Sequence, residues 1–138
     1  MFFKKKVAKE EGFHLVKIAA LLIHAAKIDE KYSNEEKDII KKTLLELGAN
    51  QNELNELITS AEQSEKKANQ ILDFTKEIKS MDEINKIKII KSLWRIIYSN
   101  KHADIYETNL MRRLSGLLYV DSKTMGNIKE QIKNEKLK

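Results

Sequence analysis

The feature that most constrains this chain is an apolar pattern that occurs twice, at a fixed offset of 71 residues and without a gap. In both copies, apolar residues recur at the three- and four-residue spacing that places them on one face of an α-helix. Val16, Ala19, Leu22, Ile23 and Ala26 align with Ile87, Ile90, Leu93, Trp94 and Ile97; Ile39, Ile40, Leu47, Leu54 and Leu57 align with Leu110, Met111, Leu118, Met125 and Ile128. A three-helix unit cannot bury its apolar face alone, so we expect the two copies to pack against each other.

Polar residues mark where the helices begin and end. The pattern predicts a first helix from about Glu10 to Ile28 and a second that begins at a capping box formed by Ser33 and Glu36. Gly48 stands where that second helix should stop. Further caps are expected at Asn50 (a box with Glu53), Asp82, Asp104 (a box with Glu107) and Asp121. The expected fold is all-α, with about seven helices: two pseudo-symmetric three-helix repeats joined by a connecting helix that carries Ala68, Ile71, Leu72 and Ile78.

Composition narrows the class of protein. The chain has no proline and no cysteine, so turn-rich strands are disfavoured and disulfides, thiolate metal sites and cysteine catalysis are excluded. No apolar run approaches the ~20 residues of a membrane span, and the first residues lack the apolar stretch of a signal peptide. We therefore expect a cytoplasmic protein. Its single helical domain should occupy residues 10–134, between a flexible basic N-terminus (1–9) and a frayed basic C-terminus (135–138).

The net charge of +5 lies at the two ends of the chain. Residues 12–121 hold 17 basic and 17 acidic side chains, so the body of the domain is neutral. A groove that follows nucleic-acid phosphates needs basic residues clustered on the folded body. We therefore expect no specific nucleic-acid site, and at most weak contacts between the basic ends and an anionic surface.

The candidate ligand-binding residues lie in the two turns that follow the first helix of each copy. The first turn offers Asp29 and Glu36, and the second offers Asp104 and Glu107, with Ser33, Glu35, Asn100 and His102 nearby. Such oxygen ligands suit a hard divalent cation such as calcium, although neither turn has the spacing of an EF-hand. Ser33 with Glu36, and Asp104 with Glu107, are also fully explained as capping boxes, and a cap is much commoner than an ion site. No phosphate loop, HExxH or nucleophile elbow is present, so we expect no enzymatic activity, catalytic residue or organic cofactor.

Two stretches resemble a known family. LLIHAAKIDEKYSNEEKDIIKKTL (21–44) and LWRIIYSNKHADIYETNLMRRLSGLLYV (93–120) are similar to the TerB-like family associated with tellurite resistance, in its stand-alone bacterial branch. The resemblance covers about Ala19 to Lys133. It implies an all-α fold with internal pseudo-symmetry and a metal ion held by acidic residues of the two turns, here Asp29, Glu36, Asp104 and Glu107. The family often has Asp-Gly where this chain has Asp29-Glu30 and Asn100-Lys101.

Two functions remain open at this point. In the first, the chain is a non-catalytic domain of a stress-response or membrane-associated assembly and senses a divalent cation through its turns. In the second, it is a metal-independent scaffold for a protein partner. That scaffold would use an exposed aromatic strip at Trp94, Tyr98, Tyr106 and Tyr119, with weak contacts to anionic partners or a membrane surface. Arg112 and Arg113 could bind an acidic partner or pair with nearby carboxylates. The oligomeric state is left open.

Overall fold

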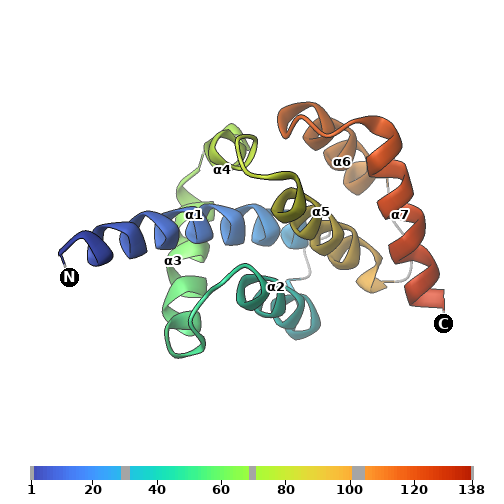
Figure 1. Ribbon diagram of the computed structural model, residues 1–138. Helices are drawn as coiled ribbons and strands as arrows, with labels where there is room; N and C mark the ends of the chain where they lie inside the picture. The colour runs from blue at the N-terminus through green and yellow to red at the C-terminus, as the bar shows by residue number, and fades with distance from the viewer. Residues whose placement is uncertain (1, 29–31, 69–70, 101–104, 138) are drawn as a thin grey trace.

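The computed structural model describes the backbone of residues 2–28, 32–68, 71–100 and 105–137, and the side chains of residues 15–28, 32–68, 71–99 and 108–135. Within these ranges every regular element is a helix, and there is no strand (Figure 1). Its elements are α1 (Phe2–Lys27), α2 (Asn34–Glu46), η1 (Gln51–Glu53), α3 (Leu54–Lys67), α4 (Leu72–Ile78), α5 (Glu83–Ile97), η2 (Tyr98–Asn100), α6 (Ile105–Leu117) and α7 (Ser122–Leu137). The expected fold class of seven helices is therefore confirmed. None of these described helices is long and apolar enough to cross a bilayer.

The core is built around the C-terminal half of α1. Between Ile18 and Ala26 every side chain except His24 is at most 1% exposed. Helices α2, α3, α4 and α5 all pack against α1, which explains why apolar residues there are buried on every side and not on a single face. Because α5 belongs to the second copy of the repeat, the two copies share one core, as the sequence predicts.

Helix α5 lies at the centre of the molecule in Figure 1 and links the first copy to α7. Its buried residues include Ile90, Leu93 and Ile97 of the expected stripe. It also buries Ser92, whose hydroxyl hydrogen-bonds the Thr43 hydroxyl of α2 across 2.7 Å. This pair satisfies two polar groups inside the core and fixes the position of α2 along α5.

The two copies also have the same backbone at their helix ends. Helices α2 and α6 each have 13 residues, and they begin and end at positions 71 residues apart. Each is followed by a residue in the left-handed region, Gly48 with φ 105° and Tyr119 with φ 57°. In both, the amide of the following residue donates to the carbonyl oxygen five residues earlier: Ala49 N–H to Leu44 and Val120 N–H to Ser115, each at 2.9 Å. These are Schellman ends, which satisfy the last helical carbonyls.

Three local expectations differ from the structure. Helix α1 begins at Phe2 and not near Glu10, because no proline or cap interrupts the preceding residues. Asn50 is a cap, but its side-chain oxygen accepts from Asn52 N–H at 2.9 Å at the start of η1 and forms no box with Glu53. Leu72 was expected in the apolar stripe of the connecting helix, but it is 46% exposed. Helix α4 has only about two turns, and its inward face carries Phe74 in place of Leu72.

The Schellman end of α2 gives a paired prediction. Gly48→Ala should destabilise the fold by about 1–2 kcal/mol, because an L-residue is strained at this positive φ. Gly116→Ala lies inside α6, where an added methyl meets no atom within 4 Å. It should stabilise the fold by roughly 0.5–1 kcal/mol through helix propensity. Urea unfolding of both variants tests this, and equal effects of the same sign would contradict the assignment.

Candidate functional site

The first candidate turn leads into α2, and its helix start is the predicted capping box. The Ser33 hydroxyl accepts a hydrogen bond from Glu36 N–H at 3.2 Å, while Glu36 Oε1 accepts from Ser33 N–H at 2.9 Å and lies 3.0 Å from the Ser33 hydroxyl. Glu36 is only 2% exposed. A carboxylate this deeply buried is stabilised by such hydrogen bonds, so one of its oxygens already acts as a cap.

Only one of the four expected metal ligands has a described side chain, and that is Glu36. Asp29 and Asp104 lie outside the described residues, and so does the side chain of Glu107 in α6. The same holds for His102 and for the side chain of Asn100. Among the side chains that the structure describes, no three histidines or carboxylates converge in a way that could hold a metal ion. The metal assignment therefore stays a prediction, while the Ser33–Glu36 cap is confirmed.

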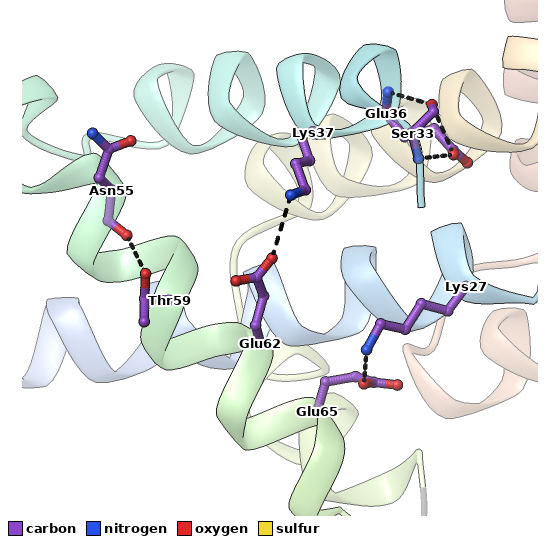
Figure 2. A network of polar contacts seen from close by, with 8 residues as sticks. All are labelled: Lys27, Ser33, Glu36, Lys37, Asn55, Thr59, Glu62 and Glu65. Carbon is purple, nitrogen blue, oxygen red and sulfur yellow. Dashed lines mark hydrogen bonds and ion pairs between the residues drawn. The ribbon is translucent and has the colours of Figure 1, made fainter. Parts of the chain in front are cut away.

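Helix α3 contributes two acidic residues that face the first two helices (Figure 2). Glu65 accepts a hydrogen bond from the Lys27 ammonium at 3.0 Å, and its other oxygen lies 3.5 Å from His24 Nδ1. Glu62 lies 3.9 Å from the Lys37 ammonium of α2. These ion pairs join separate helices, so the spacing of charges along a single helix does not reveal them. The only sequence signal is that both glutamates lie at the edge of the apolar stripe of α3.

Tyr32, at the entrance to α2, reports the electrostatic potential of this region. Its hydroxyl is buried and has no hydrogen-bond partner among the described residues, although it lies near Glu62. The Lys37 ammonium lies 4.8 Å from the centre of its ring. Burial raises the pKa of its phenol, and three carboxylates raise it further, namely those of Glu62, Glu36 and Glu65. Three carboxylates of α2 and α3 therefore lie near the Tyr32 phenol, at the end of the first turn.

The second turn does not repeat this arrangement. At the 71-residue offset, Glu62 and Glu65 correspond to Lys133 and Lys136 in α7. A carboxylate nevertheless lies near the second turn, because burial and the Glu130 carboxylate of α7 raise the pKa of Tyr98, which precedes that turn. The two turns therefore differ in sequence at these two positions, and each has a carboxylate neighbour.

The expected aromatic strip is not a surface. Trp94 is 3% exposed and Tyr98 is 5% exposed, and their rings stack at 6.0 Å between centroids. The exposed-strip interpretation is wrong for these two residues, because α7 packs over α5 and covers them. Tyr119 is 71% exposed, as expected. The side chain of Tyr106 lies outside the described residues.

Tyr119 lies instead beside a basic cavity of about 860 Å³ between α1, α3, α4 and the end of α6. The ammonium groups of Lys79 and Lys86 lie 5.7 and 6.0 Å from the centre of its ring. Lys17 and Lys67 also border the cavity. Its lining carries more lysines than carboxylates, so this face suits an anionic group.

The buried phenol of Tyr32 gives a pH prediction. In the unfolded chain it ionises near pH 10, whereas the folded protein keeps it neutral to higher pH. The stability that comes from this raised pKa is present below pH 10 and is lost as the pH rises above it. Tyr32→Phe should be at least as stable as wild type at pH 7, because it removes an unpartnered hydroxyl. The free energy of unfolding of Tyr32→Phe relative to wild type should increase by about 1 kcal/mol between pH 7 and pH 11.

Guanidinium unfolding between pH 7 and pH 11 measures this difference. Tyr119→Phe is the matched control, because that phenol is exposed, and its stability should follow wild type across the range. A constant difference between Tyr32→Phe and wild type at all pH values would contradict the assignment.

Comparison with known proteins agrees with the architecture. A family model described as "Tellurite resistance protein TerB" matches residues 15–130. No match was found among curated proteins or among solved structures. The matched range covers most of the chain and includes both copies of the helical repeat, from the buried half of α1 into α7. The chain therefore belongs to the TerB family.

Proposed function

We propose that this TerB domain is non-catalytic and binds a divalent cation such as calcium at its first turn. The observation that supports the proposal is that the carboxylates of Glu36, Glu62 and Glu65 lie near the Tyr32 phenol at the end of that turn. Glu65 and Glu62 already attract cations, the Lys27 ammonium at 3.0 Å and the Lys37 ammonium at 3.9 Å. Carboxylate oxygens are the ligands that hard cations prefer. The family resemblance supplies Asp29 as a further ligand of the same turn. The resemblance also implies a second site at Asp104 and Glu107, where the sequence has lysines at the positions that correspond to Glu62 and Glu65.

A cation at this turn must compete with two internal ammonium groups. Lys27 pairs with Glu65 and Lys37 with Glu62, so binding requires these lysines to give up part of their interaction. This competition sets a modest affinity, which suits a sensor whose occupancy changes with ion concentration. Because the carboxylates come from α2 and α3, a bound cation would hold these helices together. In the proposed setting, a cytoplasmic stress-response or membrane-associated assembly, a protein partner would detect this change in rigidity.

Thermal unfolding with increasing calcium tests the proposal. For a Kd of about 0.1 mM, about 10 mM calcium stabilises the folded state by about 2.7 kcal/mol and raises Tm by roughly 10 °C. Glu36→Gln should abolish most of this shift, and it is a clean probe because glutamine at this position still completes a capping box. Glu62→Gln and Asp29→Asn should reduce it as well.

Glu56→Gln is the matched control. Glu56 is exposed on the same helix as Glu62 and forms no described ion pair with the first turn, so its loss should leave the calcium shift unchanged. An unchanged Tm for wild type at about 10 mM calcium would sink the cation proposal. It would leave the capping box and the interhelical ion pairs as the complete role of these carboxylates.

A second candidate is a metal-independent scaffold for an anionic partner. The observation that favours it is Tyr119, which is held exposed at positive φ where the first copy has Gly48. Non-glycine residues in this region are strained, and such strain is often kept where a side chain contacts a ligand. With Lys79 and Lys86 beside it, Tyr119 would face an acidic surface. A calcium-independent partner that is lost on Tyr119→Gly would favour this candidate.

A further inference from the structure

A second, smaller cavity lies among the helices of the second copy, between α5, α6 and α7. Its volume is about 220 Å³, and Trp94 forms part of its wall. Trp94 is almost completely buried, yet its Nε1–H has no hydrogen-bond acceptor among the described residues. An unpaired buried donor costs free energy, so it indicates an acceptor that the protein itself does not supply.

The charged side chains that border this cavity are both basic. Arg112 comes from α6 and Lys129 from α7, and the Lys129 ammonium lies 5.6 Å from the centre of the Trp94 ring. No described carboxylate pairs with either residue, and none borders the cavity. The nearest helix start, that of α7, is capped by Asp121, whose carboxylate already accepts from Thr124 N–H at 2.7 Å. Among the side chains that the structure describes, these two positive charges therefore have no counterion.

The remaining wall combines apolar side chains with the hydroxyl residues Thr108, Ser115 and Ser122, and it has room. Met111 and Met125 are 1% and 6% exposed and bring flexible thioethers to the cavity. Gly126 completes the wall from α7, and a Cβ added there would meet no atom within 4 Å. The open volume thus exists partly because position 126 carries no side chain.

The first copy shows what this region looks like when it is filled. At the 71-residue offset, Trp94, Met111, Met125 and Lys129 correspond to Ile23, Ile40, Leu54 and Ile58. All four residues of the first copy are buried aliphatic side chains. At these four positions the first copy therefore has an ordinary core, whereas the second copy has an indole, two thioethers and an ammonium group beside a cavity. The replacement of a packed core by an open basic pocket has no benefit for stability, which points to a ligand.

We propose that this cavity binds a carboxylate carried on a short apolar group. The carboxylate lies between the Arg112 guanidinium and the Lys129 ammonium, where the planar arginine can donate two parallel hydrogen bonds. The apolar group packs against the Trp94 ring and the two methionines, and an oxygen of the ligand supplies the acceptor that the Trp94 Nε1–H lacks. The volume fits one residue-sized group, such as the C-terminal residue of a peptide or a free small organic acid. This proposal is independent of the cation proposal, because it involves the other copy of the repeat.

The experiment uses the full chain and N-acetyl-leucine as the probe. Trp94 is the only tryptophan, so the ¹H–¹⁵N spectrum contains one indole signal, and that signal belongs to the cavity wall. We expect a saturable shift of this signal with a Kd of about 1–10 mM, as is usual for so small a ligand. N-acetyl-leucinamide, which lacks the carboxylate, should bind at least about tenfold more weakly, because it loses the charged pair. Inorganic phosphate should give no saturable shift.

A peptide of about six residues that ends in a free leucine distinguishes the two sources of the carboxylate. Tighter binding than N-acetyl-leucine assigns the site to a peptide C-terminus, and equal binding assigns it to a free acid. The proposal is overturned if no indole shift occurs up to about 50 mM N-acetyl-leucine. It is also overturned if the amide binds as well as the acid.

Variants locate the site. Arg112→Gln and Lys129→Gln should each weaken binding by about tenfold. Gly126→Leu should abolish binding by filling the cavity, and helical circular dichroism confirms that this variant still folds. Arg113→Gln is the matched control, because Arg113 is an exposed neighbour on α6 that does not border the cavity. Unchanged binding by Arg112→Gln and Gly126→Leu would contradict this location.

Discussion

The structure depends on the burial of the C-terminal half of α1. From Ile18 to Ala26 this helix is surrounded by α2, α3, α4 and α5, and it has almost no surface left to expose. Each fully buried aliphatic side chain stabilises the fold by roughly 1.5–3 kcal/mol, which is more than any surface ion pair provides. This burial fixes where α1 ends. It thereby places Tyr32 and Glu36, which follow that end, opposite Glu62 and Glu65 of α3.

The two copies of the repeat share part of their backbone structure but differ in the residues around their candidate binding sites. The copies share the length of their middle helix, α2 or α6, and the left-handed residue that follows it. They differ where packing leaves a choice. The first copy has a filled aliphatic core and an acidic turn, whereas the second has a basic cavity beside Trp94 and lysines at the positions of Glu62 and Glu65. The proposals therefore assign a cation to one copy and a carboxylate to the other.

Local signals in the sequence were sufficient for most of the fold. The repeat, the Ser33–Glu36 box, the stop at Gly48 and the cap at Asp121 all involve residues close together in the chain. Sequence reasoning failed where packing between distant segments decides the outcome. It placed Trp94 in the apolar stripe of its helix, but one of the two proposed functions used the same residue in an exposed strip, and α7 covers that side chain.

The candidate site was predicted less completely for the same reason. Glu36 could be identified as a cap from its neighbours in the sequence, but Glu62 and Glu65, the other two carboxylates near the Tyr32 phenol, come from α3. Their pairing with Lys27 and Lys37 spans separate helices, so only the folded arrangement reveals it. The Trp94 cavity was also invisible, because a cavity is defined by what several helices leave unfilled. Only the contrast with Ile58 at the position of Lys129 marks it in the sequence.

The central claim is that both copies share one core, and native-state hydrogen exchange tests it most directly. The amides of the buried half of α1 and those of α5 should exchange with the same free energy of opening, equal to that of global unfolding. Both values should decrease in parallel as denaturant is added. If α5 and α7 open at a clearly lower free energy while α1 and α3 stay protected, the copies are separate units and the shared core is contradicted.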